Sequence, residues 1–407
     1  MFKFLHTSDL HLGKVFYDQS LVEDQAVMLE DLAGLLEDES YAALVIAGDV
    51  YDRSIPSPEA VELFGSFLWK VKKRRPSVEI LIIPGNHDSA SRLGFGRELF
   101  ARLGIHFAAS AGECEKPVVI ESGGGNCAIF LLPFIYPGVL SGESPIEEAA
   151  RRMNKARQEL ALRSPNAYTV LAAHLFASGA EEAGSERVFL GNAEHVKLSL
   201  FSGFDYIALG HLHRCQNIGG EGAHAFYSGS PLAYSFAEAG QEKFFLSVGL
   251  DKDGVKLDRI SVKPRRKVTS LSGLFTSFSG DDSSANKPSD AELAAAKDDY
   301  LEIRLTDREV RENARDVLRR RFPNLLSLRQ DEALSNIAQG TKVQISAKDR
   351  RERQDLAADF RDFLFSLYGD NAGASAELEL FNSLLVELET ADTSETVLPD
   401  TSTGEIF

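Results

Sequence analysis

Apolar runs and amphipathic stretches alternate along residues 1–265. Short apolar runs, typical of buried β-strands, cover residues 2–6, 42–47, 78–83, 128–132, 168–173, 205–209 and 244–250. Between them, apolar residues recur at helical spacing, as at 22–36 and 58–71. The alternation predicts an α/β fold in which helices connect the strands.

The pattern changes at the end of this region. Residues 276–292, TSFSGDDSSANKPSDAE, are rich in Ser, Asp and Gly and predict a flexible loop. Strand-like alternation returns in YLEIRLTD (300–307), followed by a basic amphipathic helix that ends at Pro323 and a strand-like TKVQISA (341–347). We expect residues 266–347 to form a small α+β domain.

Two amphipathic segments follow, LAADFRDFLFSLY and AELELFNSLLVELE, separated by the break YGDNAGAS. Each segment places Leu and Phe on one stripe of a helix, and such a stripe needs a partner surface. The two helices either pack on each other and on the preceding domains, or dock another chain in a helix-in-groove manner. We assign residues 348–391 to this helical region and 392–407 to a polar tail.

Composition narrows the class of protein. The chain has 407 residues, of which 43% are hydrophobic, enough for two or three domains with a sizeable core. It contains no apolar run of about 18 residues, so no membrane span is expected, and its first residues do not resemble a signal peptide. The three cysteines are widely spaced and predict neither disulfides nor a thiolate metal site, which favours a reducing cytoplasm. The net charge of -17 argues against a uniformly basic surface but allows local basic patches.

Five predicted strands end in side chains that bind metals. The stretches that follow them are SDLH (8–11), GDVYD (48–52), GNHD (85–88), the single His174, and GHLH (210–213). Each one alone predicts little, because an Asp-x-His pair is usually a solvated loop and a lone histidine is usually structural. Functional residues gather where the carboxyl ends of strands meet loops, so the ordered set predicts one site. Glycine precedes a metal-binding residue at 48, 85 and 210, where the backbone must turn without a Cβ clash.

The donor types indicate the chemistry. Histidine, carboxylate and amide without thiolate suit Mn, Fe or Zn rather than Ca or a structural zinc site. The donors are too many for one tetrahedral ion: Asp9, His11, Asp49, Asn86, His174, His211 and His213. Two ions roughly 3.5–4 Å apart, sharing one carboxylate, are the recurring arrangement for in-line attack on phosphorus. The sequence therefore predicts a two-metal enzyme acting on a phosphoester.

The ordered motifs DLH, GDVYDR, GNHD, AH and GHLH resemble the calcineurin-like metallophosphoesterases over residues 1–265. Longer segments are similar to the SbcD family, the nuclease subunits of bacterial SbcCD complexes: LHTSDLHLGKVFYDQSLVEDQ, IAGDVYDRSIPSP, IPGNHDSASRL, DYIALGHLHRCQ and YSGSPLAYSFAE. The resemblance implies a two-sheet sandwich flanked by helices, then a small α+β capping domain and C-terminal helices that bind a partner. Beyond residue 265 the match is weaker.

The resemblance also implies roles for single residues. Asp9, His11 and His213 would hold one Mn ion, Asn86, His174 and His211 a second, and Asp49 would bridge both. His87 would contact the scissile phosphate and protonate the leaving oxygen as a general acid. Asp52 would orient protonated His87, with a turn or another hydrogen bond as the alternative. Asp88 is expected to cap the following helix rather than to bind metal.

The family implies a Mn-dependent DNA nuclease of repair, replication and recombination. Its activities would be 3′-to-5′ exonuclease on double-stranded ends and endonuclease on single strands and hairpins. The partner would be an SbcC-type coiled-coil ATPase, bound by a homodimer within a heterotetramer; the chain itself has no GxxxxGK[ST] sequence for ATP. Two alternatives remain: a stand-alone phosphatase or phosphodiesterase on small substrates, and a catalytically silent scaffold.

DNA binding requires basic surface, because phosphate contacts dominate affinity. The candidates are the basic runs at 70–75, 151–157, 263–267 and 319–321, and also Arg92 and Arg97 close to the predicted site. Each run is equally compatible with an ordinary solvated helix end.

Overall fold

The computed structural model describes residues 1–108, 110–136, 144–181, 195–219, 224–280, 288–307 and 313–330. The chain divides into two compact units, Met1–Leu334 and Ser335–Phe407, and all described residues belong to the first. The predicted strand at 341–347, the helices of 348–391 and the tail at 392–407 therefore lie outside the described residues. Among the described helices, none combines the length and the apolar character needed to cross a bilayer.

Six strands form the first sheet, and every strand expected in this part of the sequence is present. In spatial order they are β14 (Gly254–Ser261), β13 (Phe244–Asp251), β1 (Phe2–Thr7), β4 (Ala43–Ala47), β5 (Glu79–Ile83) and β6 (Ile105–Phe107). The neighbouring strands β1, β4, β5 and β6 run parallel, whereas β13 is antiparallel to both β1 and β14. The parallel strands are buried on both faces, which explains their uninterrupted apolar runs.

A second sheet also has six strands. Its order is β11 (Gln216–Asn217), β12 (Ala225–Tyr227), β10 (Tyr206–Gly210), β9 (Tyr168–His174), β8 (Gly125–Leu132) and β7 (Val118–Ser122). The four central strands are parallel and the two edge strands antiparallel. The predicted α/β class is confirmed, and the predicted strands divide between two sheets, as the family resemblance implies.

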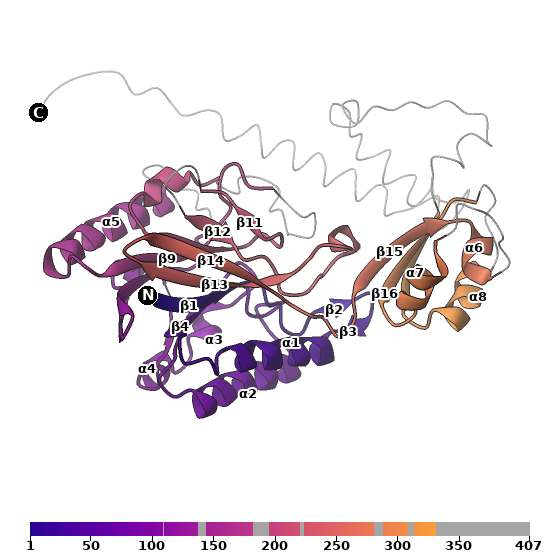
Figure 1. The fold of residues 1–407 in the computed structure, drawn as a ribbon, viewed down its shortest axis with the longest axis horizontal. Helices are drawn as coiled ribbons and strands as arrows, with labels where there is room; N and C mark the ends of the chain where they lie inside the picture. Colours follow the sequence, from indigo (N-terminus) through magenta and orange to yellow (C-terminus); the bar gives the residue numbers. More distant parts are fainter. Residues whose placement is uncertain are drawn as a thin grey trace, which may run out of the picture. The chain divides into compact units, whose positions relative to one another are not determined.

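The two sheets pack face to face, with helices outside. Their shared core includes Phe4 and Val45 from the first sheet and Val170 and Tyr206 from the second. A second core joins the first sheet to α1 (Val22–Leu35) and α2 (Pro58–Arg74), and a third joins the second sheet to α5 (Pro145–Arg163). Figure 1 shows α1 and α2 on one side of the sandwich and α5 on the other. The molecule therefore has the metallophosphoesterase layering that the resemblance implies.

Local sequence explains where α2 begins. Ser57 accepts a hydrogen bond from the main-chain N–H of Ala60, and proline occupies the first helical position. The helix buries Phe64, Phe67 and other apolar residues against the first sheet. The remaining helical pieces of the sandwich are short: α3 (Ala90–Leu93), α4 (Arg97–Ala101) and the 3-10 turns Ala111–Glu113, Leu198–Phe201 and Phe236–Glu238.

A smaller sheet follows the sandwich. Its strands β15 (Val268–Gly273), β16 (Tyr300–Leu305) and β17 (Leu325–Gln330) are parallel. Parallel strands need crossover connections, and the described ones carry α6 (Phe275–Ser279), α7 (Asp290–Ala295) and α8 (Ala314–Arg321). These helices pack on the sheet around Phe278, Leu301 and Leu318. The other face of the sheet presents Tyr300 to Phe16 of the hairpin β2 (Val15–Phe16) and β3 (Gln19–Ser20).

The loop predicted for 276–292 is wrong at both ends. Residues at its start belong to α6, where Phe278 is fully buried, and residues at its end belong to α7. A capping box begins α7, because Ser289 and Glu292 bond each other's main-chain N–H groups. Only the middle of the segment, 281–287, lies outside the described residues. The prediction relied on the polar composition of the segment and overlooked the apolar Phe278 and the capping box of Ser289 and Glu292.

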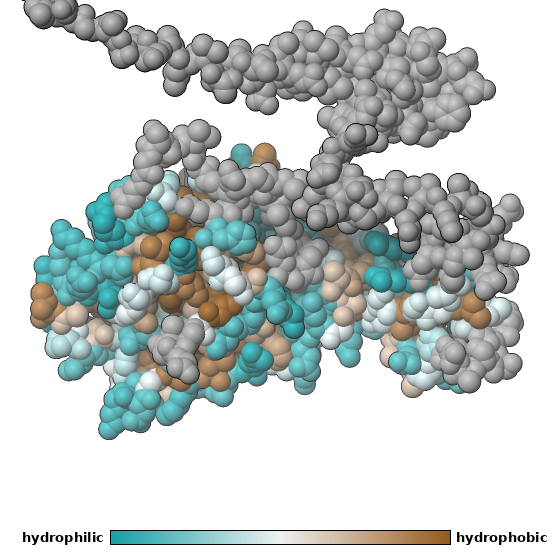
Figure 2. All heavy atoms as spheres, turned by 90° about the horizontal axis from the view of Figure 1, so that it is seen from above, coloured by the Kyte–Doolittle hydropathy of each residue, from teal (hydrophilic) through white to brown (hydrophobic). Residues whose placement is uncertain are grey.

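The surface carries both polar and apolar residues. On the face shown in Figure 2, hydrophilic residues predominate and hydrophobic residues occur in groups among them. Several predicted DNA-contact residues are engaged in ion pairs with acidic neighbours: Lys70 and Arg74 with Glu30, Arg97 with Glu113, Arg152 with Glu115, Arg265 with Glu23 and Arg266 with Asp24. The basic runs are therefore partly neutralised by the acidic surface around them.

Candidate metal centre

The predicted donors gather where the two sheets present the carboxyl ends of their strands. Asp9 and His11 follow β1, Asp49 follows β4 and Asn86 follows β5, all in the first sheet. His174 ends β9, and His211 and His213 follow β10, both in the second sheet. All seven side chains are buried, with exposed fractions between 0% and 9%. The centre is thus formed by both sheets together, a feature that the periodicity of the sequence could not predict.

The backbone adopts unusual dihedrals at the donors. Asp9, His11, Asp49 and His211 have φ values of 54°, 44°, 51° and 112°. Residues other than glycine rarely adopt such values, and the strain persists only when surrounding contacts hold it. Here the loops hold each other, because the N–H of Asp9 bonds the carbonyl of Gly48 and the N–H of His11 bonds that of Asp49, both at 3.0 Å.

The three predicted glycine turns are confirmed by close approach. A Cβ on Gly48 would lie 2.0 Å from His174 Nδ1, and one on Gly85 would lie 2.1 Å from Asp49 Oδ1. A Cβ on Gly210 would meet the carbonyl oxygen of Ala47 at 1.9 Å. Each of these glycines therefore leaves room for a donor, or for the main chain that supports one.

One group of donors surrounds His11. Its Nε2 lies 3.1 Å from Nε2 of His213 and 3.7 Å from Oδ2 of Asp49. Ligand atoms of Asp9, His11 and His213 all lie within 4.8 Å of one another. Two imidazole nitrogens that face each other among carboxylates are positioned to share one cation.

The other group surrounds Asn86. Its Oδ1 lies 3.0 Å from Nε2 of His174 and 3.1 Å from Nδ1 of His211. Oδ2 of Asp49 lies 3.7 Å from the same nitrogen of His174. The Asp49 carboxylate is consequently next to both groups, as a bridging ligand would be.

The electrostatics of the donors fit divalent cations. Burial, with a smaller contribution from the charge of Asp49, raises the pKa of Asp9 to about 6, although His174 and His213 act in the opposite direction. Burial and nearby cationic groups lower the pKa of His11 well below its ordinary value. A divalent cation would compensate the buried carboxylates, and neutral imidazoles would offer it lone pairs. The residues present therefore fit two such ions.

His87 borders these groups and is held through the main chain. Its Nδ1 lies 2.8 Å from the carbonyl oxygen of Asp52, so Nδ1 carries a proton and Nε2 faces Oδ2 of Asp49 at 4.0 Å. The predicted pairing with the Asp52 carboxylate is not the contact that forms. That carboxylate accepts a hydrogen bond from Lys14 Nζ at 2.8 Å and lies 3.7 Å from Nδ1 of His11.

The expectation that Asp88 caps a helix is wrong. The helix α3 begins after Ser89 and has no side-chain cap. The Asp88 carboxylate instead accepts hydrogen bonds from the main-chain N–H groups of Val50, Tyr51 and Gly85, at 2.9 to 3.0 Å. Burial and the charge of Asp49 raise the pKa of Asp88 to about 7. Asp88 therefore joins the loop after β4 to the loop after β5.

Several supporting residues were not assigned a role from the sequence. Gln25 at the start of α1 is fully buried; it donates to the carbonyl oxygen of His11 at 2.7 Å and accepts from the N–H of Gly13 at 2.9 Å. Glu238 and Lys243 form a buried ion pair beside His213. Gln25 and Glu238 lie in segments that carried the family resemblance, which was the available signal, but their contacts required the fold.

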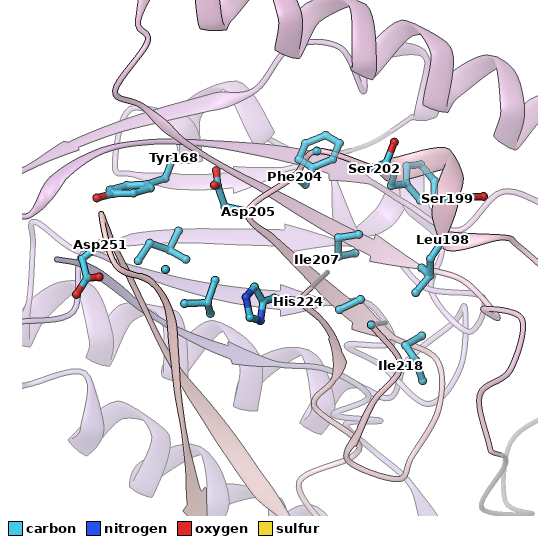
Figure 3. Close-up of a pocket in the computed structure, with 17 residues that line it drawn as sticks. Tyr168, Leu198, Ser199, Ser202, Phe204, Asp205, Ile207, Ile218, His224 and Asp251 are labelled. Atoms are coloured by element: carbon cyan, nitrogen blue, oxygen red, sulfur yellow. The ribbon is translucent and has the colours of Figure 1, made fainter. Parts of the chain in front are cut away.

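One cavity lies away from the donors. It has a volume of about 580 Å³ and is lined by Tyr168, Asp205, His224 and mostly apolar neighbours (Figure 3). Tyr168 begins β9 and Asp205 precedes β10, whereas the donors lie at the carboxyl ends of these strands. The cavity is therefore separate from the candidate metal centre.

Comparison with known proteins agrees with the geometry. Residues 2–215 match the family model of the calcineurin-like phosphoesterases, and residues 270–364 match that of the type 5 capsule protein repressor C-terminal domain. A protein from Staphylococcus saprophyticus, named as the D subunit of the nuclease SbcCD, is 31% identical over 278 residues, which are 67% of this chain and 72% of that protein. The chain belongs to the SbcD family of calcineurin-like phosphoesterases. This SbcD-family protein is accordingly a metal-dependent phosphoesterase.

Two solved structures also resemble this SbcD-family protein, both at 13% identity and a TM-score of 0.38. One is a Thermus thermophilus protein, with 64% of this chain and 99% of that chain covered. The other is a dimetal phosphatase from Danio rerio, with 65% and 99% covered. Likenesses this distant add nothing to the family assignment.

Proposed function

We propose that this SbcD-family protein is a Mn-dependent DNA nuclease. Its activities are 3′-to-5′ exonuclease on double-stranded ends and endonuclease on single strands and hairpins, as part of DNA repair, replication and recombination. The observation that carries the proposal is the meeting of two donor groups at Asp49 with His87 beside them. The word nuclease in the name of the related staphylococcal protein supports a nucleic acid as the substrate.

The proposed ligands follow the two groups. Asp9, His11 and His213 hold one ion, while Asn86, His174 and His211 hold the other, and Asp49 contributes to both. Asn86 adds an oxygen donor without adding negative charge next to the phosphate. When bound, the ions would acidify water and offset the negative charge that develops on the phosphate.

The proposed role of His87 is to protonate the leaving oxygen. The carbonyl of Asp52 holds the Nδ1 proton, so a second proton on Nε2 is directed toward the metal centre. Transfer of that proton to the leaving oxygen completes cleavage of the phosphodiester, and such general acids contribute about 10²–10⁴-fold. Asp52 thus orients His87 through its main chain, and its carboxylate, held by Lys14, provides negative charge close to His11.

The nuclease proposal is tested with two classes of substrate. Purified protein is incubated with Mn²⁺ and either a DNA hairpin or a nucleotide monoester, with and without the ATPase partner. A DNA nuclease cleaves the hairpin and leaves the monoester intact. Turnover of the monoester alone would assign the protein to the small-substrate phosphatases instead, and no turnover of either by protein loaded with metal would favour a silent scaffold.

We also propose the domain division 1–265, 266–347 and 348–391, followed by a polar tail at 392–407. In this division, the helices of 348–391 bind an SbcC-type ATPase, and the family match at 270–364 supports a dedicated C-terminal region. Three free cysteines are compatible with a reducing cytoplasm, the compartment that we propose.

A homodimer is proposed from an exposed apolar surface. Phe95, Leu99 and Leu103, around the short helix α4, have exposed fractions of 83%, 72% and 61%. Trp69 on α2 is 69% exposed. Large exposed apolar side chains on one segment commonly mark a protein–protein interface, and we propose that a second copy of the chain covers Phe95, Leu99 and Leu103.

A further inference from the structure

A buried ion pair lies beside one of the proposed metal ligands. Glu238 has no exposed surface, and Lys243 is 8% exposed. Glu238 belongs to the 3-10 turn after β12, and Lys243 immediately precedes β13. Their side chains contact each other next to His213.

The two carboxylate oxygens of Glu238 have different partners. Oε1 lies 3.3 Å from Nδ1 of His213 and accepts the main-chain N–H of Tyr234 at 3.2 Å. Oε2 accepts from Lys243 Nζ and, at 3.3 Å, from the hydroxyl of Ser230. Lys243 also donates to the carbonyl oxygen of His213 at 3.0 Å. The ion pair therefore contacts both the ring and the main chain of one residue.

A gain in fold stability does not by itself explain why the protein buries this ion pair. Removing two charges from water costs several kcal/mol per ion, and well-packed apolar residues of similar volume are often equally stable or more so. A buried pair in contact with a ligand has a second possible use, because carboxylates commonly orient metal-binding imidazoles.

The geometry of His213 supports that use. Its Nε2 faces Nε2 of His11 at 3.1 Å, whereas its Nδ1 faces Glu238. An ionised carboxylate only accepts hydrogen bonds, so it requires the proton of a neutral His213 on Nδ1. That tautomer places the lone pair on Nε2, the nitrogen that faces His11. Among the described residues, the donor groups that could hold an ion do not include Glu238.

We propose that Glu238, charge-balanced by Lys243, is a positioning residue that fixes the tautomer and orientation of His213 for metal binding. The inference rests on the proposed two-metal function. It assigns Glu238 to only one of the two ions, the one held by Asp9, His11 and His213.

The first test compares two carboxylate-to-amide variants by titration calorimetry with Mn²⁺ alone. In Glu238→Gln, we expect the affinity of one of the two sites to fall about 10–100-fold, because a neutral amide accepts a weaker hydrogen bond from His213 than a carboxylate does and leaves Lys243 uncompensated. The matched control is Glu302→Gln. Glu302 is also fully buried and paired with cations, Arg304 and Arg329, but it lies in β16. This control should leave both Mn²⁺ affinities unchanged while showing any general effect on folding in thermal unfolding.

A second pair of variants avoids leaving Lys243 uncompensated. Both carry Lys243→Met, combined with either Glu238→Gln or Glu238→Leu, so both lack the ion pair and differ in the acceptor offered to His213. If Glu238 positions His213, the Leu variant binds Mn²⁺ at least tenfold more weakly at one site than the Gln variant. Equal affinities in this pair would overturn the proposal and leave the ion pair a purely structural role.

The wild-type titration separates this inference from the proposed function. Two Mn²⁺ ions bound by wild-type protein, with equal affinities across the variants, would refute only the role of Glu238. Wild-type protein that binds no Mn²⁺ would refute both.

Discussion

At the scale of single residues, His87 borders the seven proposed ligands. The main-chain carbonyl of Asp52 accepts from one of its ring nitrogens, and we propose that the other nitrogen moves a proton rather than binds an ion. The sequence could supply this residue type and its position next to Asn86. It could not supply the atom of Asp52 that holds the ring, since that depends on how two loops meet.

Replacement of His87 by alanine tests this role. We expect His87→Ala to reduce Mn²⁺-dependent hairpin cleavage by about 10²–10⁴-fold, because the leaving oxygen loses its proton donor. Metal content, measured by mass spectrometry after loading, should stay near two ions per chain. The matched control is His106→Ala; His106 pairs with Glu79 and contacts none of the proposed ligands. Cleavage by His87→Ala at the wild-type rate would remove His87 from the mechanism.

The other residues of the site show which positions and roles could be predicted from the sequence. Seven donors could be named because each follows a recognisable strand, and the structure brings all seven together. Asp88 was assigned wrongly and Glu238 not at all, because an acidic side chain near a turn has many possible hydrogen-bond donors as partners. Their roles depend on segments distant in sequence: Asp88 bonds residues of the loop after β4, and Glu238 contacts His213 across β12.

At the scale of elements, the first turn of α1 links two parts of the molecule. Asp24 accepts a hydrogen bond from the hydroxyl of Tyr300 in β16 at 2.8 Å, and the next residue, Gln25, bonds the loop that carries His11. Two hydrogen bonds, made by the adjacent residues Asp24 and Gln25, therefore link the small parallel sheet to the main chain of His11, a proposed metal ligand. Periodicity predicted α1 and β16 individually, but contacts between elements so far apart in the chain are not encoded in a local pattern.

The Tyr300–Asp24 bond should stabilise the fold measurably. We expect Tyr300→Phe to lower the free energy of unfolding by about 1.5–3 kcal/mol, as for loss of a hydrogen bond to a charged group. Urea denaturation measures the change. Tyr168→Phe is the matched control, because within the described residues the hydroxyl of Tyr168 forms no hydrogen bond, and its loss should change stability by less than about 0.5 kcal/mol. Equal stability of both variants would show that the Asp24 bond does not anchor the sheet.

At the scale of the whole molecule, the proposed homodimer depends on the apolar surface around α4. Leu99→Glu combined with Leu103→Glu would place two charges in the interface, and burying unpaired charge is strongly unfavourable. We expect the double variant to run as a monomer in sedimentation while remaining folded, with a melting temperature no higher than that of the wild type. Charge placed at Leu162, which is 87% exposed on α5, is the control and should leave the dimer intact. A dimeric double variant would exclude this surface as the interface.

The proposed partner site makes a separate prediction at this scale. Deletion of residues 350–407 should abolish binding of the partner ATPase in a pull-down, because the apolar stripes proposed to dock on it are removed. Mn²⁺ binding should persist, since every proposed ligand lies between residues 9 and 213. Undiminished ATPase binding by the truncated chain would place the docking surface elsewhere.

The division of the candidate metal centre between two sheets has a consequence for how this phosphoesterase is made in the cell. The segments that supply Asp9 and Asp49 leave the ribosome long before those that supply His211 and His213, and neither half can hold a full set of ions. A chain released early carries no competent centre. Hydrolysis at the proposed centre therefore begins only after synthesis and packing of both sheets are complete.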